Sequence, residues 1–142
     1  MKLVTHLLDT KGRDIISITE DASVLDAITI MAERSIGSLP VMHGDELRGI
    51  VTERDYARKV IVKGRSSKST LVKEIMTADV LTASPDQTVN ECMTVMSERR
   101  IRHLPVVDDG KVIGLISIGD LVQAIISDQQ EEIQHLEQYI SG

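Results

Sequence analysis

Two short stretches of the chain carry a hydroxyl residue three positions ahead of an aspartate. They are Thr52-Glu53-Arg54-Asp55 and Ser117-Ile118-Gly119-Asp120. At a helix start, this pattern satisfies free backbone N–H groups of the first turn. The same geometry can serve a ligand, because these N–H groups attract phosphate and a carboxylate accepts paired hydroxyls. Helix capping and ligand binding are therefore both open at each turn.

Both stretches lie in an internal repeat. Residues 15–62 align with residues 80–127 without a gap, at a constant offset of 65. Identical pairs fall in turns as well as at apolar positions, and Leu-Pro-Val at 39–41 and 104–106 is among them. A chance match would not extend over both, so the chain contains a duplicated unit.

The pattern of each copy predicts the order β-α-β-β-α. A short apolar stretch, 15–18 or 80–83, predicts a leading strand. Ser23 and Thr88 then start helices, because each precedes an acid by three positions and apolar residues at helical spacing. Two apolar runs joined by turn residues predict a hairpin, and the hydroxyl–aspartate turn begins the last helix. The predicted fold class is α/β (α+β), divided into repeats at 1–64 and 65–127 and a C-terminal helix at 128–142.

Composition narrows the function classes. The 142-residue chain carries a net charge of -6, which argues against a general nucleic-acid binder. Tyr56 and Tyr139 are its only aromatic residues, so stacking platforms for single strands are missing. No apolar run reaches 18 residues, and the N-terminus soon becomes charged, so we expect no membrane span, no signal peptide and a cytoplasmic location.

Side chains that could support catalysis are scattered. The four histidines do not cluster, and Cys92 aligns with Ala27 as a small core residue. No P-loop, nucleophile elbow or metal-ligand spacing occurs, so we expect that the protein is not an enzyme. One basic segment allows two interpretations. The basic residues between Arg54 and Lys73 form a solvated surface or help to bind phosphate, with Arg54 and Arg65 as the candidates.

The C-terminal segment predicts a further helix that begins at Ser127. Ile133, Leu136 and Ile140 form an apolar stripe on it. The stripe could pack back on its own domain or meet a second copy in a homodimer.

Two stretches, one in each repeat, resemble the sequence of a known family. The stretches SLPVMHGDELRGIVTERD and HLPVVDDGKVIGLISIGD resemble the signature of the cystathionine β-synthase (CBS) domain. CBS domains occur in tandem pairs, called Bateman modules, and this chain resembles the small stand-alone pairs. The resemblance implies two repeats packed through their sheets with pseudo-twofold symmetry. It also implies binding of an adenosine compound (AMP, ADP, ATP, NAD or S-adenosylmethionine) in clefts between the repeats, and frequent dimers.

The resemblance assigns binding roles to specific positions in each copy. The turn aspartates take ribose, the turn hydroxyls and the positions before Leu-Pro-Val take phosphate, and the leading strand faces the base. Thr77 is a polar contact that Gly12 does not match in the alignment. In the first copy the positions are Ile15, Ile16, Ser38, Pro40, Thr52 and Asp55, and Arg54 joins them as the candidate from the basic segment. In the second copy they are Thr77, Val80, Leu81, Arg102, His103, Pro105, Ser117, Ile118 and Asp120.

The predicted function is a non-catalytic regulatory module. Binding of an adenine nucleotide would signal the energy or redox state of the cell to an effector protein. The alternative is a ligand-independent module for oligomerisation or scaffolding.

Overall fold

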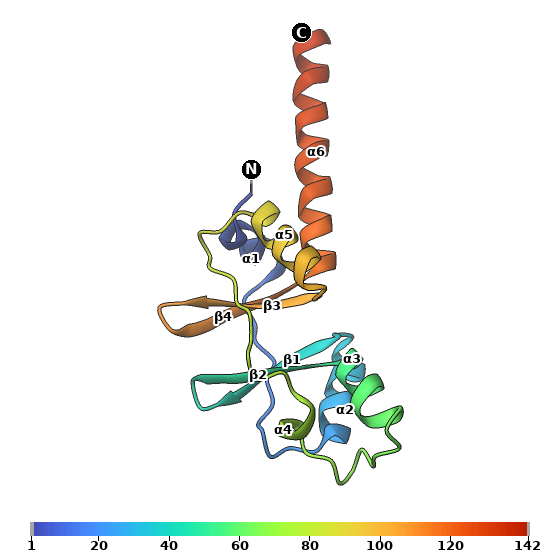
Figure 1. Ribbon diagram of the computed structural model, residues 1–142. Helices are drawn as coiled ribbons and strands as arrows, with labels where there is room; N and C mark the ends of the chain where they lie inside the picture. The colour runs from blue at the N-terminus through green and yellow to red at the C-terminus, as the bar shows by residue number, and fades with distance from the viewer. Residues whose placement is uncertain (1, 142) are drawn as a thin grey trace. The chain divides into compact units, whose positions relative to one another are not determined.

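The computed structural model describes residues 2–141, and the chain divides into two compact units (Figure 1). The first-repeat unit comprises residues 15–81 and 110–112. The second-repeat unit comprises, among the described residues, 2–14, 82–109 and 113–141. Among the described residues, the fold is mixed α/β with a two-stranded antiparallel sheet for each repeat, which confirms the predicted fold class.

The first-repeat unit contains one helix before the hairpin and short helices after it. Ser23 caps the N-terminus of α2, accepting a hydrogen bond from the backbone N–H of Asp26 at 3.1 Å. Strands β1 and β2 pair antiparallel, with Ser38 opposite Thr52 and a register shift between Val41 and Met42. The elements are α2 (Val24–Arg34), β1 (Ser38–His43), β2 (Glu46–Thr52), α3 (Glu53–Tyr56), the π-helix η1 (Ala57–Ile61) and α4 (Val72–Ile75).

The second-repeat unit has the same plan with a longer last helix. Thr88 caps α5 as Ser23 caps α2, and Glu91 completes a capping box. Helix α6 is continuous through Ser127, so the separate helix start predicted there is wrong. No glycine or proline follows Gly119 before the end of the helix, so no residue interrupts it. The elements are α1 (Val4–Lys11), α5 (Val89–Arg99), β3 (His103–Asp108), β4 (Lys111–Ser117) and α6 (Ile118–Ser141).

The leading segment of each repeat pairs at one residue instead of forming the predicted strand. Ile18 bridges Val41 in parallel, donating to Pro40 O and accepting from Met42 N; Ala83 does the same beside Pro105. The next bond of such a ladder would need the N–H of residue 40 or 105. Both are prolines, which lack that donor, so the pairing stops there.

Helix α1 packs in the second-repeat unit, although it precedes the first repeat along the chain. Its Val4 N–H donates to Gln87 O at 2.9 Å, as the Val72 N–H of α4 donates to Ala22 O at 2.9 Å. Gln87 and Ala22 are equivalent positions of the repeat, so α1 and α4 are equivalent elements. Each unit is thus completed by a helix that precedes the other repeat in sequence, which differs from the predicted division at residue 64.

Two equivalent glycines let these helices approach the sheets. A Cβ atom on Gly114 of β4 would lie 2.6 Å from Leu8 Cδ2, and one on Gly49 of β2 would lie 2.8 Å from both Met76 Sδ and Thr77 O. Both distances are shorter than the closest approach of a Cβ atom to a non-bonded heavy atom. A side chain at either position would force a neighbour to move, which explains why both copies carry a glycine.

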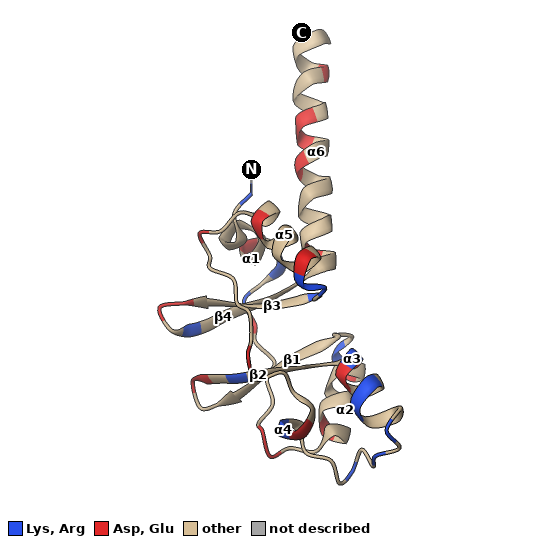
Figure 2. Ribbon diagram, in the orientation of Figure 1, with Lys and Arg blue, Asp and Glu red and all other residues tan. Residues whose placement is uncertain are grey.

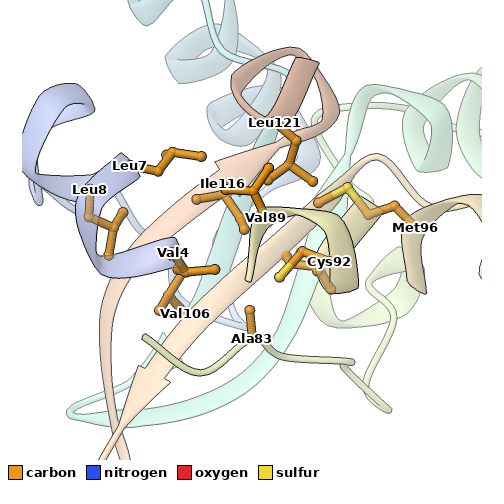
Figure 3. Packing of buried hydrophobic residues seen from close by; sticks show 11 residues of the cluster. Val4, Leu7, Leu8, Ala83, Val89, Cys92, Met96, Val106, Ile116 and Leu121 are labelled. Atoms are coloured by element: carbon orange, nitrogen blue, oxygen red, sulfur yellow. The ribbon is translucent and has the colours of Figure 1, made fainter. Parts of the chain in front are cut away.

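Each unit has its own hydrophobic core. In the second-repeat unit, Val4, Leu7 and Leu8 of α1 point toward Ile116 and other apolar side chains of the sheet and of α5 and α6 (Figure 3). The other buried residues of this cluster are Ala83, Val89, Cys92, Met96, Leu104, Val106 and Leu121. The first-repeat core consists of Ile18, Val24, Ala27, Met31, Leu39, Val41, Val51, Val60, Val72 and Ile75. These cores hold the end of each hairpin against the helix that follows it.

Candidate functional site

The first candidate site is the turn between β2 and α3. Thr52 Oγ1 accepts from the Asp55 backbone N–H at 3.1 Å, and Asp55 Oδ2 accepts from the Thr52 backbone N–H at 3.0 Å. The Thr52 hydroxyl also lies 3.1 Å from Asp55 Oδ2. The second carboxylate oxygen, Oδ1, lies 3.1 Å from Lys59 Nζ, one helical turn later. The predicted capping geometry is present, and it fixes the orientation of the carboxylate.

The second candidate site is the turn between β4 and α6, and it repeats this geometry. Ser117 Oγ accepts from the Asp120 N–H at 3.2 Å, and Asp120 Oδ2 accepts from the Ser117 N–H at 2.8 Å. Here the lysine comes from a distant segment: Lys11 Nζ lies 2.5 Å from Asp120 Oδ2 and donates to Leu115 O. Both candidate aspartates therefore pair with a lysine, but from different parts of the chain.

The environment of Asp120 favours its charged form. Burial raises the pKa of this carboxyl, but the hydrogen bond from Lys11 lowers it, as do the Ser117 N–H, the Lys11 charge and the Ser117 hydroxyl. The balance lowers the pKa below the ordinary value for aspartate. Asp120 is therefore held as a carboxylate, the form that accepts hydrogen bonds from hydroxyl groups.

Backbone hydrogen bonds bring the residues before Leu-Pro-Val to each turn. The Glu53 N–H donates to Gly37 O at 3.1 Å, and the Ile118 N–H donates to Arg102 O at 2.9 Å. In the second copy, this contact places Arg102 and His103 beside Ser117, Ile118 and Asp120. Arg102 is exposed and His103 is half-buried, so the cationic side chain is open to solvent.

The corresponding first-copy residues are less accessible. Ser38 is only 1% exposed, and its β1 neighbour Pro40 is also buried, as is Pro105 in β3. Arg54 is half-buried beside Thr52 and Asp55. The side chains around the two turns thus differ in charge and exposure.

The leading segments present apolar side chains to solvent. Ile15 is 38% and Leu81 39% exposed, and Ile16 and Val80 are half-buried. Ile15 and Ile16 lie in the same unit as Asp55. Val80, Leu81 and Thr77 also lie in the first-repeat unit, whereas Asp120 lies in the second-repeat unit.

Thr77 is fixed at the edge of the first hairpin. Its backbone N–H and C=O both bond to Ile50, at 2.9 and 3.0 Å. Since Leu8 contacts Gly114 as Met76 contacts Gly49, the structural counterpart of Thr77 is Asp9. The alignment with Gly12 is therefore wrong, because the copies differ in length between this helix and the leading segment.

The sequence predictions missed the two lysines that contact the aspartates. Lys59 follows Asp55 by four positions, a spacing that favours an ion pair on one helix and that could have been recognised. Lys11 is remote from Asp120 in sequence, and only the folded position of α1 brings them together. Of the two basic residues singled out earlier, Arg65 forms an ion pair with Glu74 at 2.7 Å.

Groups for other chemistry are sparse in the part of the chain that the structure describes. No three His, Cys, Asp or Glu side chains there could hold a metal ion together. Cys92 is buried, and burial raises the pKa of its thiol, which disfavours the reactive thiolate. The two turns remain as the candidate sites, because a carboxylate, a hydroxyl residue and a lysine meet at each of them.

A family comparison connects these features. The model of the CBS domain matches the chain twice, over residues 9–62 and 72–127. The chain belongs to the CBS domain family. The repeats found in the sequence are its two CBS domains, and each matched region contains one hydroxyl–aspartate turn.

Similar proteins support this assignment. A mitochondrial CBS domain-containing protein of Arabidopsis thaliana, CBSX3, is 42% identical over 98% of this chain and 72% of its own length. A putative signal-transduction protein with CBS domains from Burkholderia ambifaria is 55% identical, with a TM-score of 0.87 over 90% of this chain and 96% of that chain.

One similar structure contains bound ligands. The CBS domain pair of protein MJ0100 was solved in complex with 5′-methylthioadenosine and S-adenosyl-L-methionine. It is 29% identical to this chain, with a TM-score of 0.78 over 87% of this chain and 99% of that chain.

Among residues 2–141 of the present chain, no helix is long and apolar enough to cross a membrane.

Proposed function

We propose that this chain is a non-catalytic regulatory module that binds an adenosine-containing ligand at its hydroxyl–aspartate turns. The repeated turn geometry carries the proposal: at each turn a carboxylate is fixed by a backbone N–H and a hydroxyl residue. A carboxylate held in this way can accept both hydroxyls of a ribose. The ligands of the similar MJ0100 pair share adenosine chemistry, which supports the same class here.

The second-copy turn is the better site for a phosphorylated ligand such as AMP, ADP, ATP or NAD. Arg102 and His103 lie beside it, whereas Gly37 and Ser38 occupy these positions in the first copy. A guanidinium group can bind phosphate through two hydrogen bonds, which glycine and serine cannot do. The two turns would therefore differ in the ligands that they prefer.

Binding would be read by another protein. We infer that occupancy reports the energy or redox state of the cell to an effector protein. Such coupling is typically worth about 1–3 kcal/mol. A ligand-independent scaffold is the alternative, and direct binding measurements separate the two.

Isothermal titration of ligand-free protein with AMP, ATP, NAD, S-adenosylmethionine and 5′-methylthioadenosine tests the proposal. Asp55→Asn and Asp120→Asn keep the size of each side chain but remove its charge. Glu91→Gln is the matched control, because Glu91 makes the same capping contact at α5, away from both turns. We expect at least one aspartate variant to lose binding while the control retains it.

Two results would contradict the proposal. One is that the folded, ligand-free protein binds none of these compounds, which would favour the scaffold. The other is that binding survives both aspartate substitutions, which would place the ligand elsewhere.

A further inference from the structure

Helix α6 carries a regular apolar stripe that the second-repeat unit leaves uncovered. Its apolar members are 42% to 82% exposed, and its positions follow one another at the alternating four- and three-residue steps of a heptad repeat. Gln129 fills the one polar position. The stripe consists of Val122, Ile126, Gln129, Ile133, Leu136 and Ile140.

The C-terminal half of α6 has no packing partner among the described residues of its own unit. Every residue from Gln129 to Ser141 is exposed, and this half of the helix extends beyond α1 and α5 (Figure 1). A helical segment of this length is marginal in water unless its apolar face is buried. The stripe therefore indicates that something packs against α6.

The stripe is self-complementary in the antiparallel direction. With two α6 helices antiparallel, Val122 lies opposite Ile140, Ile126 opposite Leu136, and Gln129 opposite Ile133 of the second copy. Each layer forms twice, as a two-fold axis requires. No other stripe position is left over.

Charge also favours this direction. The C-terminal half of α6 contains acidic residues and no lysine or arginine (Figure 2). A parallel pair would place Glu132 beside Glu137 of the second copy on both sides of the seam. The antiparallel pair places like charges together once, where Glu132 meets its own copy.

The antiparallel pair also offers Glu137 an oppositely charged neighbourhood. Glu137 of the second copy would lie beside Gln123 of the first. Gln123 lines a cavity of about 320 Å³ between α1 and α6, together with Lys2, His6, Lys11 and Asp120. Lys11 pairs with Asp120, so Lys2 and His6 are the other basic side chains of this lining that an incoming carboxylate could meet.

We propose that α6 is a dimerisation helix that pairs antiparallel with α6 of a second copy, with Glu137 of each copy directed toward Lys2 and His6 of the other. An anionic membrane surface fits the stripe poorly, because acids flank it and lysines do not. Pairing of the stripe does not require a bound nucleotide, although Asp120 of the second turn lines the same cavity.

Sedimentation equilibrium of the full chain tests the interface. We expect a dimer, and Leu136→Glu should raise its dissociation constant at least about tenfold, because a charge would be buried at two symmetric positions. Gln138→Glu is the matched control: it adds the same charge on the opposite face of α6, where it should change dissociation by less than about threefold. Both substitutions are at exposed positions.

Cysteine crosslinking tests the direction of pairing. In a Cys92→Ala background, the double variant Val122→Cys/Ile140→Cys should form a crosslinked dimer under mild oxidation, and neither single variant should. A disulfide needs Cβ atoms about 3.5–4.5 Å apart, and only the antiparallel pair brings positions 122 and 140 together. Crosslinking of each single variant would show parallel pairing and overturn the proposal.

A charge exchange tests the contact at the cavity. Glu137→Lys should weaken the dimer about two- to fivefold, and the added substitution Lys2→Glu should restore it. A monomeric wild-type chain, or a dimer unaffected by Leu136→Glu, would also overturn the proposal. If the wild-type chain is monomeric, a different protein would bind to the stripe.

Discussion

The amino group of Lys11, at the end of α1, is hydrogen-bonded to the carboxylate of Asp120, in the first turn of α6, with Nζ 2.5 Å from Oδ2. This contact joins α1, which overlaps the start of the first CBS domain match, to the proposed ribose-binding residue of the second domain. In the first domain, Asp55 pairs instead with Lys59 of the same helical segment. The carboxylate of Asp120 is thus in direct contact with α1.

Loss of the Lys11 amine should tighten binding at the second turn. A ribose that takes both carboxylate oxygens of Asp120 must displace Lys11, so Lys11→Met should raise the affinity for 5′-methylthioadenosine about two- to fivefold. This ligand is suitable because it carries no phosphate that Lys11 could attract. Arg13→Met is the control, since Arg13 pairs with Asp9. Weaker binding by Lys11→Met in titration calorimetry would show that Lys11 contacts the ligand.

The lowered pKa of Asp120 predicts a loss of stability in acid. Because its folded pKa lies below the unfolded value of about 3.9, its stabilising contribution is present above that value and is lost as pH falls through the folded pKa. The contribution of this partly exposed pair should stay below about 1 kcal/mol. We expect Asp120→Asn to be less stable than the wild type at neutral pH and the difference to shrink below about pH 4. Urea denaturation across this range measures it, and a constant difference would contradict the prediction.

The end of α2 offers a stabilising substitution. Ser35 is in the left-handed region, with φ of 54°, where its Cβ atom is strained. Ser35→Gly should therefore raise the free energy of unfolding by about 0.5–1 kcal/mol. Ser97→Gly, in the interior of α5 at an exposed position, should lower it by a similar amount. Denaturant titration distinguishes the two, and equal effects of both substitutions would argue against strain at Ser35.

Elements specified by neighbouring residues were predictable from the sequence. The helix starts at Ser23 and Thr88 depend on a hydroxyl and an acid three positions apart, and the observed capping bonds confirm them. Both hairpins follow from apolar runs around turn residues. The capping geometry of the turns at Asp55 and Asp120 was predictable for the same reason, whereas the binding role of those aspartates stays a prediction.

Features that depend on distant contacts were not predictable in this way. The position of α1 depends on hydrogen bonds such as that from Val4 to Gln87, which no local pattern encodes. The pairing of Lys11 with Asp120 follows from that position. The single bridge at Ile18 is a different case, because the missing N–H of Pro40 explains it and is visible in the sequence. The continuity of α6 is also visible in the sequence, because no glycine or proline follows Gly119 before the helix ends.

The two strand glycines should differ in their tolerance of a methyl group. At Gly114, the added Cβ would meet the end of the Leu8 side chain, which can turn aside. At Gly49, it would meet Thr77 O, a backbone atom that accepts from the Ile50 N–H in a residue also held through its own N–H. Gly114→Ala should therefore destabilise its unit by about 1 kcal/mol and Gly49→Ala by about 2–3 kcal/mol. Leu8→Val in the Gly114→Ala background should recover part of the loss, because it shortens the side chain that the Cβ would meet. Urea denaturation of the four variants, including Leu8→Val alone, measures the coupling, and a Gly114→Ala variant less stable than Gly49→Ala would contradict the packing described for α1.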